Sequence, residues 1–122
     1  MTVTGPDFIA LQVRDLGRAA AFYEDHLGLR RPPFSPPHAV VFATTPVPFA
    51  VRDTQPDVDL DAVGHPGLGV ALWLHSTDAQ ALHDSLDAAG VPILTPPFDG
   101  PFGRTFAFAD LDGYAVTIHD KQ

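Results

Sequence analysis

The chain has 122 residues, 45% hydrophobic and 18% charged, which is the composition of one ordinary globular domain. The net charge of −8 argues against a nucleic-acid partner, because phosphates attract surfaces rich in Lys and Arg. Without cysteine there are no disulfides, thiolate nucleophiles or cysteine metal sites, and no apolar run approaches the ~20 residues of a membrane span. The first residues lack the basic and apolar regions of a signal peptide, so we expect a cytoplasmic protein with no membrane partner.

The first half of the chain begins with a predicted strand and a predicted helix. The apolar run of residues 8–13 is typical of a buried strand. Asp15 is a predicted helix N-cap, and apolar side chains follow it at helical spacing as far as Leu27. Gly28 suits the left-handed position that ends a helix, so we expect the helix to end just before it.

Two more strands complete this half. We expect them at residues 38–43 and 49–52, after a proline-rich loop over residues 30–37. A linker that contains four aspartates then runs from about residue 53 to residue 66. A fourth strand of this half would fall near residues 54–66, where the pattern marks it poorly.

The second half repeats the order of strand and helix. Residues 69–74 form a predicted strand, and Ser76 or Thr77 is the predicted cap of the helix that follows. Gly90 is expected to end this helix. The side chains of its expected buried face are Ala79, Leu82, Leu86 and Ala89.

The remaining residues predict a short strand, a loop and a hairpin. Residues 91–94 resemble a short strand, and residues 96–103 form a predicted loop rich in Pro and Gly. The last two strands are expected at residues 105–109 and 114–119. The segment Asp110–Gly113 joins them, and its Asp-Gly pair is a strong hairpin signal.

Several short patterns occur twice, about 60 residues apart, which indicates an internal duplication. Ala-Leu opens a strand at Ala10 and again at Ala71, and a glycine ends a helix at Gly28 and again at Gly90. The sequence therefore predicts an α+β fold built from two tandem β-α-β-β-β modules. Module 1 covers about residues 6–60 and module 2 about residues 67–120, within one domain that spans residues 1–122.

Two groups of motifs resemble the vicinal oxygen chelate superfamily, which contains glyoxalases, extradiol dioxygenases, fosfomycin-resistance enzymes and bleomycin-resistance proteins. The segments Val13–Leu16, Ala21–Tyr23 and Leu27–Leu29 resemble its first module. Phe108–Gly113 resembles the second-module motif, with Leu111 in place of the usual proline. The resemblance covers nearly the whole chain and implies that the two modules form a curved-sheet cleft.

The resemblance also indicates where a metal would bind in this superfamily. The positions that carry metal ligands in metal-using members correspond to Phe8, to about Gly69 and to Thr117. These side chains do not supply the imidazoles and carboxylate that a divalent metal requires. We therefore expect no cofactor and no metal at these positions. His75 and His119, at the ends of two predicted strands, are the candidates for a rebuilt site and weak candidates for acid–base catalysis.

Strand alternation predicts which side chains line the cleft, since residues two apart share a face. Trp73, the only tryptophan, offers a flat surface for an aromatic or cationic group. Phe42 is a candidate to line the cleft, and Arg104 is a candidate to bind an anionic group of the ligand. The full set of predicted ligand-binding residues is Phe8, Gln12, Phe42, Trp73, His75, Arg104, Thr117 and His119.

Three functions remain open at this point. The first is a metal-free binding protein of the bleomycin-resistance type, which sequesters an aromatic or cationic compound such as an antibiotic. The second is a metal-dependent enzyme of glyoxalase, isomerase or dioxygenase type, a lyase or oxidoreductase with non-standard ligands. The third is a domain with a structural or interaction role. The resemblance to bleomycin-resistance proteins favours the first function and implies a homodimer.

Overall fold

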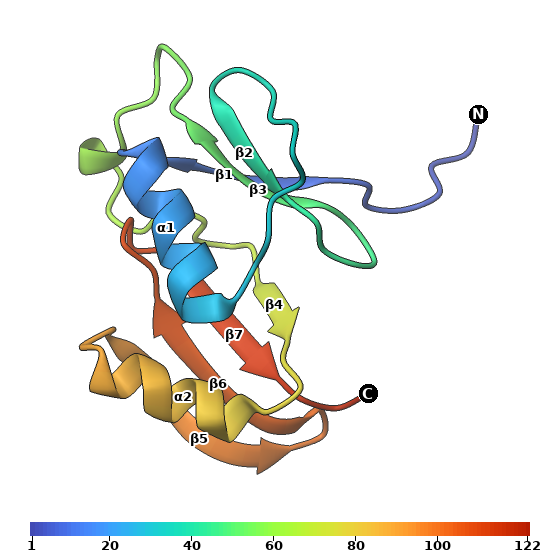
Figure 1. Cartoon of the computed structure of the whole chain (residues 1–122), viewed down its shortest axis with the longest axis vertical. Helices are drawn as coiled ribbons and strands as arrows, with labels where there is room; N and C mark the ends of the chain where they lie inside the picture. The colour runs from blue at the N-terminus through green and yellow to red at the C-terminus, as the bar shows by residue number, and fades with distance from the viewer. The chain divides into compact units, whose positions relative to one another are not determined.

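Two small sheets, each with one helix packed on one face, are built from the two halves of the chain (Figure 1). The computed structural model describes residues 1–122 and divides into two units, Met1–Ala62 and Val63–Gln122. This arrangement confirms the predicted α+β fold of two related modules. No helix is both long enough and apolar enough to cross a membrane.

The first unit contains three strands, one α-helix and a short 3-10 helix. Their bounds are Ile9–Val13 (β1), Leu16–Leu27 (α1), Ala39–Phe42 (β2), Phe49–Asp53 (β3) and Leu60–Ala62 (η1). The strand order is β1-β3-β2, with β1 parallel to β3 and β2 antiparallel to it.

Helix α1 begins and ends where the sequence predicts. The side chain of Asp15 accepts a hydrogen bond from the Arg18 N–H at 3.0 Å. Gly28 has φ 72° and donates its N–H to the Glu24 carbonyl at 3.1 Å. The buried ring of Tyr23 packs against Phe42 and Phe49, so this helix covers the β2–β3 side of its sheet.

The second unit contains four strands and one α-helix. Their bounds are Leu72–His75 (β4), Ala79–Ala88 (α2), Ile93–Gly100 (β5), Gly103–Ala109 (β6) and Ala115–His119 (β7). The strand order is β4-β7-β6-β5, with β4 parallel to β7 and the other neighbours antiparallel. The predicted hairpin at Asp110–Gly113 is confirmed, since the Asp110 carboxylate accepts the N–H groups of Asp112 and Tyr114.

The two units differ by one strand, and the missing strand is not the one that the sequence left uncertain. Strands β1, β2 and β3 pair with one another as β4, β6 and β7 do, so β5 has no counterpart in the first unit. In the first unit, the position equivalent to β5 falls in residues 30–37. This segment contains four prolines, which lack a backbone N–H donor. The strand expected near residues 54–66 does not exist, and only η1 lies there.

The prediction of a loop over residues 96–103 is also wrong, because most of this segment belongs to β5. Pro96 and Pro97 lie between two shifts in register, one between Ile93 and Thr95 and one between Thr95 and Phe98. Strand β5 lies at the edge of its sheet, where a residue without a backbone N–H is tolerated.

Two boundaries of the second module also need correction. Strand β4 begins at Leu72 rather than at Gly69, whose φ of +94° lies in the left-handed region. The cap of α2 is Asp78, which accepts the Ala81 N–H at 3.0 Å, whereas Ser76 accepts the N–H of Asp78 itself. Of the expected buried face, Ala79 and Leu86 are fully buried, Leu82 is half-buried and Ala89 is exposed.

Candidate functional site

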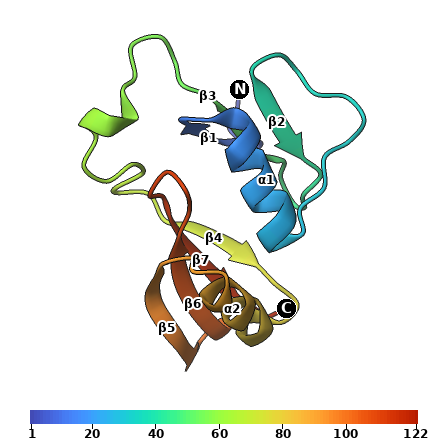
Figure 2. The same cartoon turned by 60° about the vertical axis from the view of Figure 1, so that its left-hand side comes forward.

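The second sheet has one face packed under α2 and an opposite face that α2 does not cover (Figure 2). His83 of α2 contacts the ring of Phe106, which places this side of β6 under the helix. Because side chains alternate along a strand, Thr105 and Ala107 point to the opposite side. We call this opposite side the open face of the second sheet.

Register across the strands places four predicted site residues on the open face. Trp73 pairs with Thr117, which pairs with Ala107. His75 pairs with His119, which pairs with Thr105. The structure therefore brings Trp73, His75, Thr117 and His119 together, as strand alternation predicted.

Four rings on this face contact one another, and we call them the aromatic cluster. Its members are Trp73, His75, Phe102 and His119. The Trp73 ring lies 5.4 Å from Phe102 and 5.8 Å from His119, measured between centroids. His75 and His119 are 5.5 Å apart and nearly perpendicular. Edge-to-face arrangements are among those that aromatic rings prefer.

The cluster presents apolar ring surface to solvent. The side chain of Trp73 is 44% exposed and that of Phe102 is 52% exposed. Beside them lie the small side chain of Ala107 and the hydroxyl of Thr117. Small-molecule sites are usually lined by aromatic and apolar side chains with a few hydrogen-bonding groups, and this face carries both kinds.

Sequence reasoning missed Phe102 because strand alternation assigns faces only within strands, and this residue lies between two of them. Phe102 lies in the tight β5–β6 turn, and its carbonyl accepts the N–H of Lys121 at 3.0 Å. Next to it, the Arg104 N–H donates to the Asp120 carboxylate at 2.8 Å. The turn is thus attached to the residues that follow β7, which places the Phe102 ring over Trp73 and His119. The available signal was the segment Gly100-Pro-Phe-Gly103, a turn pattern that carries an aromatic residue.

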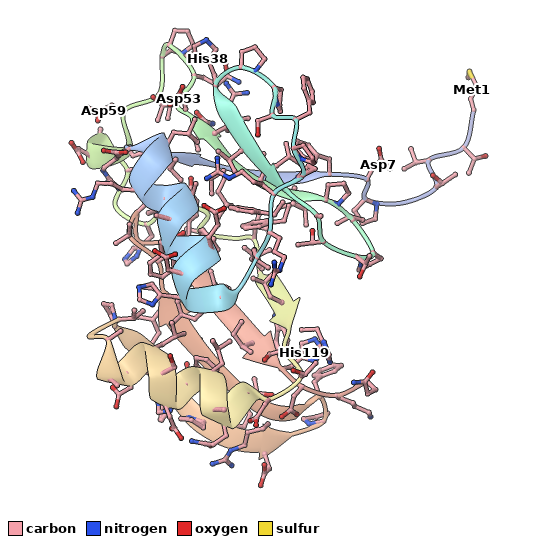
Figure 3. The ribbon with its side chains drawn as sticks, viewed as in Figure 1. Met1, Asp7, His38, Asp53, Asp59 and His119 are labelled. Carbon is pink, nitrogen blue, oxygen red and sulfur yellow. The ribbon has the colours of Figure 1, made fainter.

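His119 is the last residue of β7 (Figure 3). Its ring is part-exposed, yet its Nδ1 atom is buried and has no hydrogen-bond partner. Buried polar atoms without partners are uncommon in folded proteins, so this nitrogen requires an explanation.

Two predicted site residues lie away from the open face. The ring of Phe42 has no exposed surface and packs against Tyr23 and Phe49, so the structure places it in the core of the first unit. Arg104 precedes Thr105 in β6 and therefore points to the α2 side. Its guanidinium donates to Gln80 at 2.8 Å and to Asp99 at 3.2 Å, so it is engaged within the protein.

The other two predicted residues, Phe8 and Gln12, belong to the first unit. Phe8 is exposed just before β1. The Gln12 side-chain oxygen accepts the N–H of Gln55 at 2.7 Å, which ties β1 to the segment after β3. The side chain of Gln12 thus makes a contact within the first unit.

The residues at the positions where the resemblance places metal ligands do not fit a divalent metal. Phe8 is aromatic, Gly69 has no side chain and Thr117 offers only a neutral hydroxyl, whereas divalent metals prefer imidazole, carboxylate or thiolate donors. The structure contains no group of three or more His, Cys, Asp or Glu side chains that could hold a metal ion. His75 and His119 are adjacent, but they are two ligands where catalytic zinc sites have three.

The sequence profile of the Glyoxalase/Bleomycin resistance protein/Dioxygenase superfamily matches residues 5–118, so the chain belongs to this superfamily. No curated protein sequence matches the chain.

Several solved structures share the fold. The antibiotic-binding protein TnmS3 from Streptomyces sp. CB03234 is 23% identical with a TM-score of 0.75, and the match covers 100% of this chain and 99% of that chain. The fosfomycin resistance protein FosX from Listeria monocytogenes is 17% identical with a TM-score of 0.74, over 99% and 96% of the two chains. A lactoylglutathione lyase from Agrobacterium tumefaciens is 19% identical with a TM-score of 0.67, over 98% and 96%.

Proposed function

We propose that this protein binds a planar aromatic small molecule, cationic or neutral, on the aromatic cluster, and sequesters it without a metal. The observation that carries this proposal is the part-exposed pair of Trp73 and Phe102, held at 5.4 Å on the open face. A flat aromatic ligand gains stacking energy on such rings, and a cationic ligand also gains attraction to the ring face.

Three further features support this function. The net charge of −8 raises the local concentration of cationic compounds around the protein. Among the fold relatives is a protein described as antibiotic-binding, which shows that this fold can serve binding. The only titratable groups of the aromatic cluster are the imidazoles of His75 and His119. The cluster therefore does not contain a nucleophile, a base and a group that orients the base.

The test is a titration of metal-stripped protein with a panel of aromatic cations. The fluorescence of Trp73, the only tryptophan, monitors binding. We expect saturable quenching or a blue shift. Calorimetry with the same compounds should show that Trp73→Ala and Phe102→Ala each weaken binding by at least about fivefold. Phe34→Ala is the matched control, because Phe34 is an exposed aromatic residue in the first unit, outside the cluster. Equal effects of Phe34→Ala and Phe102→Ala would contradict a site at the cluster.

The second candidate function is a metal-dependent enzyme with non-standard ligands. The adjacency of His75 and His119, with ring centroids 5.5 Å apart, is the observation that favours it. Anaerobic titration with Mn²⁺, Ni²⁺, Zn²⁺ and Fe²⁺ tests it. A stoichiometric metal response that is lost in His75→Ala or His119→Ala would support this candidate over metal-free sequestration.

A further inference from the structure

The buried nitrogen of His119 restricts the tautomer of its ring. Contacts with Trp73, His75 and Phe102 hold the ring, and Nδ1 is sealed without any partner. A neutral imidazole carries its proton on one nitrogen and a lone pair on the other. The two tautomers therefore differ in what is buried at Nδ1: an N–H donor in one case and a bare lone pair in the other.

Burial favours the tautomer with a bare Nδ1. An orphaned buried N–H is rarer in folded proteins than an under-satisfied acceptor, and leaving a buried donor without an acceptor is costly. The proton then resides on Nε2. This second nitrogen makes no hydrogen bond within the chain and is not sealed as Nδ1 is, so its N–H is free to donate to a bound molecule.

We infer that His119 is held as the Nε2–H tautomer and donates this hydrogen bond to an oxygen of the ligand that stacks on Trp73 and Phe102. The ligand class is therefore a planar ring system that carries a carbonyl or equivalent oxygen acceptor at its edge. A cationic group on the same ligand lies away from His119, because an N–H donor repels positive charge. This inference rests on the proposed function and adds the chemical class of the ligand.

The first test measures the tautomer without any ligand. Long-range proton–nitrogen NMR correlations of ¹⁵N-labelled protein, recorded at slightly alkaline pH, distinguish a protonated ring nitrogen from a bare one. The spectrum of His119→Gln assigns the signals. We expect a bare Nδ1 and a protonated Nε2 for His119, and a protonated Nδ1 would overturn the inference.

The second test compares two probes that differ only in the acceptor. One is 9-fluorenone and the other is fluorene, each with the same quaternary ammonium side chain. We expect the ketone to bind about fivefold more tightly to the wild-type protein. His119→Phe keeps an aromatic ring but removes the donor, so the preference for the ketone over the hydrocarbon should disappear in this variant.

Two variants sharpen this comparison. His119→Gln places an amide N–H near the position of Nε2 and should keep the preference for the ketone. His65→Phe makes the same chemical change at an exposed histidine outside the cluster and should also keep it.

The outcomes separate the inference from the proposed function. Equal binding of both probes, weakened for both by Trp73→Ala, would overturn the acceptor class and leave aromatic sequestration standing. If neither probe bound saturably, both the inference and the proposed function would be overturned.

Discussion

Gly103 occupies a position that its neighbours allow only to glycine. Its φ is +85°, and a Cβ atom there would collide with the Asp120 carboxylate and approach the Lys121 backbone nitrogen at 3.0 Å. Asp120 is itself engaged, because it accepts the Arg104 N–H at 2.8 Å. The residue next to Phe102 is thus constrained by both conformation and contact, which links the turn to the aromatic cluster.

We expect Gly103→Ala to lower the free energy of unfolding by about 1–3 kcal/mol, since it forces a side chain into a left-handed and crowded position. Urea denaturation measures this change. Gly64→Ala is the matched control, because its φ is not in that region and a Cβ atom added there would meet no other atom within 4 Å. A loss of stability no larger for Gly103→Ala than for Gly64→Ala would contradict this account of the turn.

At the scale of elements, an ion pair ties α1 to the proline-rich loop that follows it. Arg31 donates two hydrogen bonds to the Glu24 carboxylate, at 3.0 and 2.7 Å. The hydrogen bond from Arg31 lowers the pKa of Glu24, and the attraction between the charges adds to this effect. The pair attaches the loop in the first unit where a strand equivalent to β5 would otherwise lie.

The lowered pKa of Glu24 determines how the contribution of this pair depends on pH. A carboxyl whose pKa is lower in the folded state adds stability above its unfolded pKa and loses it as the pH falls through the folded pKa. We expect Arg31→Gln to cost about 0.5 kcal/mol at neutral pH, as for other exposed pairs, and nothing once Glu24 is protonated in the folded protein.

Urea unfolding of wild type and variant at several pH values measures this dependence. Arg30→Gln removes the same charge from the neighbouring residue, whose side chain has no hydrogen-bond partner in the structure. A cost that is equal in the two variants, or that persists in acid, would show that the Glu24–Arg31 contact contributes nothing specific.

At the scale of the whole molecule, the net charge of −8 acts on any charged ligand. We expect the affinity for a cationic aromatic probe to fall as NaCl rises from about 0.01 to about 1 M, over which the Debye length shrinks from about 30 to about 3 Å. A neutral probe of the same ring system should not weaken, because stacking does not depend on screening. Calorimetry at several salt concentrations measures both, and a neutral probe that weakens in parallel would contradict the electrostatic explanation.

Local chemistry made much of the fold predictable. The ends of α1 follow from Asp15 and Gly28, whose capping interactions involve only neighbouring residues. The Asp110–Gly113 hairpin has the same local origin. Strand alternation also placed Trp73, His75, Thr117 and His119 on one face, since the two-residue period of a strand needs no knowledge of its partner.

The remaining features depended on contacts between segments distant in the chain. Pro96 and Pro97 indicate a loop locally, but pairing with β6 makes them part of β5. The prolines have no backbone N–H, and they lie where the register of the pairing shifts. Phe102 joins the aromatic cluster only because the turn beside it bonds to Asp120 and Lys121.

The sequence by itself therefore determined the superfamily, the order of the elements and the residues that share a face. Only the tertiary structure decided which aromatic residues meet, because helix caps and strand periods are local whereas ring contacts depend on pairing across the sheet. For the same reason, Phe42 belongs to the core and Arg104 to the α2 side, although both are residue types suited to a ligand site.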